Sequence, residues 1–308
     1  MRLDSLFLSV VMVKDSHHHN NSHVPVLLEA VETYLAPKFG ESYLDLTAGY
    51  GGHASRIKSN LGDTSKMTLV DRDQNAILSL KSSELKLSRI IHSDFASIAK
   101  SFVENGEKFD MILVDLGVSS PHLDNAERGF SFQTDAPLDM RMDPRQEVTA
   151  KTIVNKSSKD ELIKILRNYS EEPKAKVIAD AIVKNRPISS TLELAQIVEE
   201  TYGRRGKIHP ATRTFQALRI AVNQELQQLE ELLSILPDLL NEGGRAAIIS
   251  FHSLEDRMVK RAFAEEVGKG YESRFKLVTK KPISGATEDV FNRRARSAKL
   301  RVVMKINT

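Results

Sequence analysis

The sequence contains no cysteine and no tryptophan among its 308 residues. Without cysteine the chain can form no disulfide, no thiolate nucleophile and no cysteine-based zinc or iron–sulfur site. Basic and acidic residues nearly balance at a net charge of +3, so the total charge does not by itself predict a nucleic-acid partner. The absence of cysteine fits a cytoplasmic protein, and we expect that location.

Long hydrophobic runs are also missing. The apolar run at residues 6–13 is too short to span a bilayer, and it lacks the basic start and small-residue cleavage site of a signal peptide. We therefore predict no membrane partner, and a flexible leader over residues 1–22. The three histidines at positions 17–19 have no accompanying ligands, so we predict no metal site.

Short apolar runs alternate with helical patterns through the first part of the chain. We predict strands at residues 43–47, 66–71, 89–92 and 109–115, with helices between them at residues 53–60, 76–87 and 98–104. Such alternation predicts a parallel sheet with crossover helices on both faces. Ligands of such sheets bind beyond the carboxyl ends of the strands, and Asp71 and Asp115 lie at two of these ends.

A turn-rich stretch at residues 117–145 interrupts this alternation, and only helical patterns follow it up to about residue 205. Two capping boxes, Ser158 to Glu161 and Ser190 to Glu193, mark helix starts there. We predict a helical domain at 146–205, inserted into an α/β domain formed by 23–145 and 206–308. The remaining patterns predict a long helix at 210–236 and strands at 243–251, 275–280 and 300–306, which complete a sheet of seven strands.

The stretch from Asp45 to His53 places three glycines between a predicted strand and a predicted helix. Bare backbone at a helix N-terminus lets a ligand approach closely. The stretch fits a dinucleotide fingerprint loosely, and it fits the glycine pattern of S-adenosylmethionine sites except that Thr47 takes the first glycine position. A phosphate loop is excluded because no Gly-Lys-Ser/Thr follows, and a tight turn without a ligand is the simpler alternative. Seven strands without a second nucleotide-binding half favour methyl transfer over hydride transfer.

Several longer blocks resemble one family. They are Asp115-Leu-Gly-Val-Ser-Ser-Pro-His-Leu-Asp124, Arg128-Gly-Phe-Ser-Phe132, Pro137-Leu-Asp-Met-Arg-Met-Asp143, the block from His209 to Ile220, Ser250-Phe-His-Ser-Leu-Glu-Asp-Arg257 and Arg296-Ser-Ala-Lys-Leu-Arg301. Over about residues 23–305 the sequence is similar to the bacterial ribosomal RNA small subunit methyltransferase H family. This resemblance implies S-adenosylmethionine-dependent methylation of N4 of a cytosine in the decoding region of 16S rRNA, with the small ribosomal subunit as partner. The implied fold is a seven-stranded, Rossmann-like methyltransferase sheet with an inserted all-helical domain.

Carried over by motif, the family's cofactor contacts fall on Gly51, Gly52, His53, Asp71, Phe95, Asp115 and His122. Asp71 would accept hydrogen bonds from the ribose hydroxyls, and Phe95 would pack beside the adenine. His122 departs from the family pattern, which has glutamine there, but its ring can still donate or accept a hydrogen bond.

The missing cysteine also bears on the reaction. Methylation of carbon 5 of a pyrimidine generally uses a cysteine nucleophile, whereas methylation of an exocyclic nitrogen needs no covalent intermediate with the enzyme. An acceptor for an N4 hydrogen would assist the transfer, and we expect Asp115 or the loop that follows it to supply this acceptor, with Asp139 as a weaker candidate. The alternative is that Asp115 only positions the cofactor. His252, Ser253 and Asp256 are sequence neighbours at a strand–helix junction, which indicates a capped helix start rather than a hydrolytic triad.

Basic residues gather in the second half of the sequence. We predict RNA contacts from Arg204, Arg205, Lys207, Arg213, Arg293, Arg294, Arg296, Lys299 and Arg301. Phosphate contacts would make RNA binding sensitive to salt, although a solvated charged face is the alternative. Two other functions stay open: a catalytically inactive RNA-binding or ribosome-assembly factor on the same fold, and a nicotinamide-dependent oxidoreductase. The sequence does not predict the oligomeric state.

Overall fold

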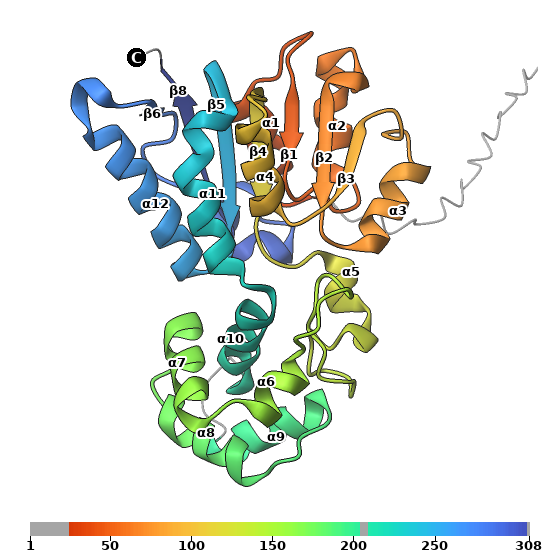
Figure 1. The fold of residues 1–308 in the computed structure, drawn as a ribbon, viewed down its shortest axis with the longest axis vertical. Coiled ribbons are helices and arrows are strands. Elements are labelled where there is room, and N and C mark those ends of the chain that lie inside the picture. Colours follow the sequence, from red (N-terminus) through yellow and green to blue (C-terminus); the bar gives the residue numbers. More distant parts are fainter. Residues whose placement is uncertain (1–24, 204–208, 307–308) are drawn as a thin grey trace, which may run out of the picture.

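The computed structural model describes residues 25–203 and 209–306. These residues form two lobes (Figure 1): a central sheet with helices on both faces, and a smaller lobe made of helices. The two lobes meet at the edge of the sheet where its parallel strands end.

The sheet has the strand order β3-β2-β1-β4-β5-β8-β6. Its five parallel strands are β1 (Tyr43–Asp45), β2 (Met67–Asp71), β3 (Arg89–His92), β4 (Phe109–Asp115) and β5 (Leu240–Ser250). The antiparallel strand β8 (Lys299–Lys305) lies between β5 and β6 (Phe275–Leu277). This arrangement confirms the predicted α/β sheet, and a two-residue strand, β7 (Ile283–Ser284), adds to the seven predicted strands by pairing with β8.

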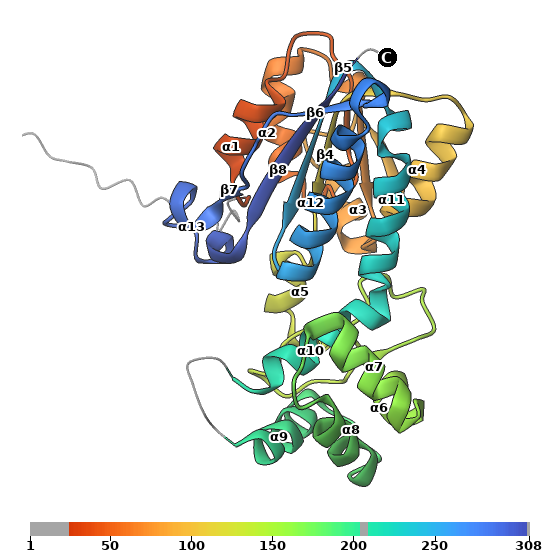
Figure 2. The ribbon, with the colours of Figure 1, turned by 90° about the vertical axis from the view of Figure 1, so that its left-hand side faces the viewer.

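Both faces of the sheet are covered, and the strand β4 shows why. Its side chains alternate between the faces, as the geometry of a strand requires: Ile112 and Val114 join one core cluster, and Met111 and Leu113 join another. The first cluster lies under α4 (Phe95–Glu104), α11 (Glu225–Leu239) and α12 (Ser253–Gly268). The second lies under α1 (Leu28–Leu35), α2 (Gly52–Leu61) and α3 (Gln74–Ser82). A strand buried on both faces reads as a continuous apolar run, and Figure 2 shows the resulting layers.

The helical lobe contains α6 (Ala150–Lys156), α7 (Lys159–Ser170), α8 (Ala175–Lys184), α9 (Thr191–Tyr202) and α10 (Ala211–Asn223). Its core also takes in side chains from outside residues 146–205, including Phe130 and Leu138 before that range and Phe215 after it. The division of the chain into domains stays a prediction. The hydrophobic core that holds these helices together nevertheless extends in both directions along the chain.

The predicted single helix over residues 210–236 is wrong. Gln224 adopts a left-handed conformation with φ 52° and ψ 35°, which ends α10 and starts α11. The buried side chain of Asn223 holds the end of α10 by accepting a hydrogen bond from Met142 N–H at 2.8 Å and donating one to the Met140 carbonyl at 2.7 Å. The break therefore lies where the chain leaves the helical lobe and enters the layer of helices on the sheet.

The turn-rich stretch after β4 is ordered by short elements. It contains α5 (Ser120–Asp124) and a 3₁₀ turn, η2 (Ala126–Arg128). Within the described residues, no helix is both long enough and apolar enough to cross a membrane, and no group of three or more His, Asp or Glu side chains is arranged to hold a metal ion.

Candidate active site

Three carboxylates stand at the carboxyl ends of adjacent strands. Asp45 ends β1, Asp71 ends β2 and Asp115 ends β4, and β1 pairs with both of the other strands. The sequence predicted this position for Asp71 and Asp115, and the structure places both there. Asp45 is 1% exposed and joins them in one acidic row.

The turn after β1 is fixed by hydrogen bonds to this row. Gly49 N–H donates to Asp71 Oδ2 at 2.7 Å, and Thr47 N–H donates to Asp45 Oδ1 at 3.1 Å. The Thr47 hydroxyl accepts a hydrogen bond from Asp115 N–H at 2.6 Å. The threonine in the first glycine position therefore ties the turn to β4, a contact that glycine could not make.

Gly51 and Gly52 lie where the turn becomes α2, and side chains would not fit at either position. Gly51 has φ +85°, and a Cβ there would lie 2.7 Å from Leu85 Cδ1. A Cβ on Gly52 would lie 2.4 Å from Pro25 Cγ. The glycines therefore let the loop pack against its own protein neighbours. By contrast, a Cβ on Gly49 or Gly117 would meet its nearest atoms at 3.9 Å and 3.7 Å, which are ordinary van der Waals contacts, so the protein leaves room beside the backbone of these two glycines.

Burial raises the pKa values of the carboxylates in this row. Burial raises the pKa of Asp45 to about 7, and the charge of Asp71 adds to the increase while hydrogen bonds from Tyr43 and Thr47 oppose it. For Asp115, burial and the carboxylates of Asp45 and Glu255 raise the pKa to about 8. The pKa of Asp71 is also raised by burial. Such perturbed groups gathered in one place are typical of functional sites.

Asp115 is only partly covered by protein. Its side chain is 26% exposed, and its Oδ2 lies 3.8 Å from His53 Nε2. Its Oδ1 has no hydrogen-bond partner within residues 25–203 and 209–306. An acceptor oxygen in that state can receive a hydrogen bond from a ligand or substrate.

Two of the predicted cofactor residues are largely covered by protein. His53 is 7% exposed in the first turn of α2, and Phe95 is 9% exposed as the first residue of α4, where it belongs to the core cluster on that face. Their contact with a cofactor stays a prediction.

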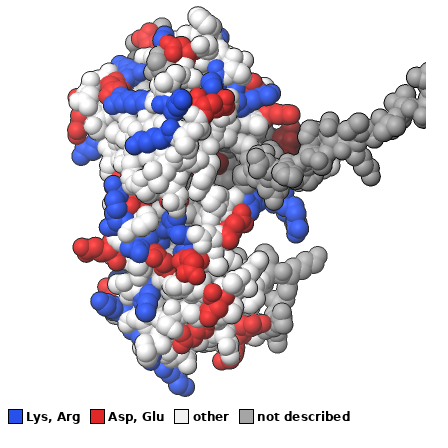
Figure 3. All heavy atoms as spheres, turned by 90° about the vertical axis from the view of Figure 1, so that its right-hand side faces the viewer, with Lys and Arg blue, Asp and Glu red and all other residues white. Residues whose placement is uncertain are grey.

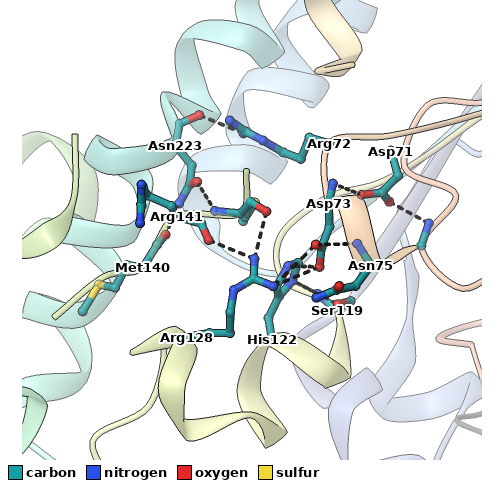
Figure 4. Close-up of polar contacts among 12 residues, drawn as sticks. Asp71, Arg72, Asp73, Asn75, Ser119, His122, Arg128, Met140, Arg141 and Asn223 are labelled. Carbon is teal, nitrogen blue, oxygen red and sulfur yellow. Dashed lines mark hydrogen bonds and ion pairs between the residues drawn. The ribbon is translucent and has the colours of Figure 1, made fainter. Parts of the chain in front are cut away.

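His122 lies in α5 and faces Asp73, the N-cap of α3 (Figure 4). Its Nδ1 accepts a hydrogen bond from Ser119 N–H at 3.2 Å, so the ring proton is on Nε2, which lies 2.9 Å from Asp73 Oδ2. Burial by itself would raise the pKa of Asp73, but the contacts with His122, Asn75 N–H and Arg128 hold it below its ordinary value. The cofactor contact predicted for His122 stays a prediction, and the ring also fastens α5 to the strand that ends at Asp71.

Arg128 extends this cluster to the helical lobe. It donates hydrogen bonds to Asp73 at 3.3 Å and to the carbonyl groups of Arg141 and Met142 at 3.0 and 2.9 Å. Arg72 donates to the Asn223 carbonyl at 3.0 Å. Sequence reasoning missed Asp73, Arg128 and Asn223 as a set. The only available signal was that Asp73 stands before a helical pattern, which is typical of an N-cap.

Asp139, the second candidate acceptor, is already paired. Arg141 donates to both of its carboxylate oxygens at 2.7 Å. Burial by itself would raise the pKa of Asp139, but these contacts hold that pKa below its ordinary value. A carboxylate in this state is a weaker proton acceptor than Asp115.

The carboxyl end of β5 carries the predicted helix start. His252 is the N-cap of α12, and Glu255 accepts hydrogen bonds from Phe251 N–H at 2.8 Å and His252 N–H at 3.2 Å. The structure therefore shows a capping box with His252, not Ser253, as the cap. Glu255 is 2% exposed, and it contributes to the raised pKa of Asp115.

The predicted RNA-binding residues fall into three groups. Arg204, Arg205 and Lys207 lie outside the described residues. Arg213, Arg293, Arg294 and Arg296 are exposed. Lys299 and Arg301 both pair with Asp256, at 2.9 and 2.7 Å. On the face seen in Figure 3, Lys and Arg side chains of both lobes are interspersed with Asp and Glu.

A Rossmann-like sheet in which the antiparallel β8 lies between β5 and β6, with a carboxylate row around a glycine turn, is typical of the class of methyltransferases. Residues 20–306 match the sequence profile of the MraW methylase family, and the chain belongs to that family.

Relatives support the membership along the whole length. A protein from Geobacter sp. (strain M21) is 47% identical over 310 residues, covering 92% of this chain and 98% of the relative. One from Acidobacterium capsulatum is 45% identical over 296 residues, with the same coverage. One from Synechocystis sp. is 43% identical over 312 residues, covering 99% of this chain and 98% of the relative. Each is named ribosomal RNA small subunit methyltransferase H.

Solved structures are similar at low sequence identity. TrmN from Thermus thermophilus aligns at a TM-score of 0.42 and 14% identity, covering 91% of this chain and 48% of that one. N-methyltransferase NodS from Bradyrhizobium japonicum aligns at a TM-score of 0.41 and 10% identity, covering 91% of this chain and 94% of that one.

Proposed function

We propose that this protein transfers a methyl group from S-adenosylmethionine to N4 of a cytosine in the decoding region of 16S rRNA. The observation that carries the proposal is Asp115, a carboxylate with a raised pKa and an unpaired oxygen at the carboxyl edge of the sheet. It stands in a chain that is 47% identical to a relative named for small subunit rRNA methylation.

The residues at this edge fit S-adenosylmethionine. The Asp71 carboxylate accepts hydrogen bonds from Gly49 and Asp73 N–H groups, and a carboxylate has about four acceptor sites, which leaves room for ribose hydroxyls. The open backbone at Gly49 and Gly117 permits close approach. When bound, the cofactor supplies a reactive methyl group on a positively charged sulfur.

A positive charge also suits this acidic row. Mutual repulsion adds to burial in raising the pKa values of Asp45 and Asp115. A cation nearby favours the ionised form of a carboxylate and lowers its pKa. Bound cofactor therefore leaves Asp115 ionised and able to accept a hydrogen bond.

Asp115 is the acceptor for the amino group of the target base. Bound S-adenosylmethionine would supply the methyl group: the cytosine nitrogen would bond to the methyl carbon while the bond from that carbon to sulfur would break, with its electrons staying on sulfur. The nitrogen loses one proton, which Asp115 takes and passes to water. General base assistance of this kind contributes typically about 10²–10⁴-fold to a rate.

The substrate is the 16S rRNA of the small ribosomal subunit, and the protein acts in the cytoplasm, where that RNA is found. The target base must leave its stack to reach the methyl donor. The ordered stretch at residues 117–145 and the helical lobe border the carboxyl edge (Figures 1 and 2), which supports a role for them in enclosing that base.

The test is to incubate the purified protein with labelled S-adenosylmethionine and with either small subunits or free 16S rRNA lacking the modification, and to map the labelled nucleotide. We expect one labelled N4-methylcytosine. Asp115→Asn should lower the rate at saturating cofactor, whereas Asp110→Asn, at the other end of β4, should not.

Three outcomes would contradict the proposal. Cofactor binding without RNA methylation would favour the inactive RNA-binding factor. A rise in melting temperature with a nicotinamide cofactor but not with S-adenosylmethionine would favour an oxidoreductase. Full methylation by Asp115→Asn would remove the acceptor role and leave Asp115 as a cofactor-positioning residue.

A further inference from the structure

An exposed aromatic residue lies beside two arginines on the segment that leads into β8. We call residues 289–296 the Phe291 loop; it follows α13 (Gly285–Glu288) and includes most of the 3₁₀ turn η4 (Arg293–Ser297). Phe291 is 99% exposed. Arg293 and Arg296 are exposed and line a hollow of about 390 Å³. Within the described residues neither arginine has a carboxylate partner.

The loop is anchored at several points, so the exposure of Phe291 does not come from a loosely held segment. Asp289 accepts a hydrogen bond from Leu27 N–H at 2.9 Å. Arg294 pairs with Asp124 of α5 at 2.9 Å. Ala295 is fully buried, and its carbonyl oxygen would lie 1.9 Å from a Cβ on Gly285, which shows how tightly the two backbones pack.

These anchors place the loop at the carboxyl edge of the sheet. Asp124 ends the short helix that follows β4 and Asp115. The strand after the loop begins at Lys299, which pairs with Ser250 at the end of β5. Figure 2 shows α13 and α5 at the edge of the sheet that faces the helical lobe. The loop therefore borders the proposed reaction site.

We propose that the Phe291 loop is a nucleotide-binding subsite for single-stranded RNA next to the target base, in which the Phe291 ring stacks on a base and Arg293 and Arg296 bind the adjoining phosphate. The proposal rests on the proposed function, since it assumes an RNA substrate. Aromatic rings combined with a positive groove are the usual means of holding single-stranded nucleic acid without reading its sequence.

The local charges favour RNA over a protein partner. Two acidic residues lie on the loop and beside it, and Asp289 is already engaged by Leu27 N–H and by the side chain of Asn292. The charged side chains that line the hollow are those of Arg293, Arg296 and Asp289, so the lining carries a net positive charge. A phosphate is the matching group.

The experiment compares binding of fluorescent 16S rRNA fragments, naked 16S rRNA and assembled small subunits to the full chain and its variants. Phe291→Ala should weaken binding to naked RNA by about 5- to 150-fold, the range expected for loss of one stacked base. Phe291→Trp should restore it. The double variant Arg293→Ala/Arg296→Ala should also weaken binding. Its affinity should depend less on salt, by the amount expected for the loss of about one to two phosphate contacts.

Tyr271→Ala is the matched control. Tyr271 is fully exposed, but it precedes β6 and therefore lies at the end of the strands opposite to their carboxyl ends. It should bind RNA like the unaltered protein. Affinity for S-adenosylmethionine should be unchanged in all variants, which separates this subsite from the cofactor site.

Equal RNA binding by Phe291→Ala and the unaltered protein would overturn the subsite while leaving the proposed function in place, provided that the unaltered protein methylates RNA. The subsite would also be overturned if Phe291→Ala lost binding to assembled subunits but kept its binding to naked RNA. Phe291 would then contact a ribosomal protein. If the unaltered protein binds cofactor but neither binds nor methylates RNA, the proposed function itself fails.

Discussion

Asp115→Asn should make the protein without cofactor more stable at neutral and alkaline pH. The carboxyl group of Asp115 has a pKa of about 8 in the folded protein, against an ordinary value of 3.8, because of burial and the nearby carboxylates of Asp45 and Glu255. A group whose pKa is raised by folding keeps its proton in the folded state while the unfolded chain ionises. Stability is therefore lost as the pH rises from about 4 to about 8.

The size of this loss follows from the pKa values. A gap of one pH unit corresponds to about 1.4 kcal/mol, so the full gap sets an upper limit of ~6 kcal/mol at pH 8. Water reaches a quarter of the side chain, which is 26% exposed, and an asparagine amide also needs partners. We therefore expect a gain of roughly 2–3 kcal/mol, or roughly 3–5 °C in melting temperature for a chain of this size.

Thermal denaturation without cofactor, recorded at intervals from pH 4.5 to 8.5, measures this effect. The difference between Asp115→Asn and the unaltered protein should be near zero at the acid end and should grow with pH. Asp110→Asn provides the opposite case on the same strand. Although burial opposes it, hydrogen bonds from Ser42 and Asn241 hold the pKa of Asp110 below its ordinary value, so this variant should be less stable at neutral pH and approach the unaltered protein only in acid. A difference in melting temperature between Asp115→Asn and the unaltered protein that stayed the same at every pH would refute the reasoning.

Three further substitutions test separate parts of the structure. Gly51→Ala should lower the melting temperature and weaken S-adenosylmethionine binding in a calorimetric titration, because φ is +85° and the new Cβ would lie 2.7 Å from a leucine side chain; the left-handed conformation alone costs about 1–2 kcal/mol. Asn223→Ala should lower the free energy of unfolding in urea by about 2–4 kcal/mol, since it leaves buried backbone groups of Met140 and Met142 without partners. Arg301→Ala should lower the melting temperature by a few degrees while reducing RNA affinity less than the loss of the Phe291 loop arginines, because Arg301 is committed to Asp256 at 2.7 Å; the reverse order would show that Arg301 contacts RNA.

The sheet was predictable because its strands carry their signal locally. β4 (Phe109–Asp115) is apolar on both faces and ends in an acid, so its type, its direction and the position of Asp115 all follow from a few neighbouring residues. The same holds for the capping box at Ser158, in which the hydroxyl and the Glu161 carboxylate bind each other's backbone N–H groups. Local sequence determines such features because the interacting groups are only three residues apart.

Features that depend on distant partners were not predictable. The apolar stripe continues through Gln224, and nothing near it in the sequence requires a break. The break is fixed by Asn223, whose side chain bonds with backbone groups of Met140 and Met142 on another segment. Likewise, Lys299 and Arg301 belong to a basic cluster in the sequence, and only the fold brings Asp256 against them.

The contacts of Asp73 connect the proposed cofactor site to the orientation of the helical lobe. Asp71, which accepts from the glycine turn, also accepts a hydrogen bond from Asp73 N–H at 2.7 Å. The Asp73 side chain in turn holds Arg128, and Arg128 donates to the Met142 carbonyl at 2.9 Å. Moving the helical lobe away from the sheet would break these charge-assisted bonds and leave Asp73 with its contacts to His122 and Asn75 N–H. Because the Arg128 bonds reach a carboxylate that is 1% exposed, they favour one position of the lobe that borders the proposed RNA site relative to the acid proposed to hold the ribose.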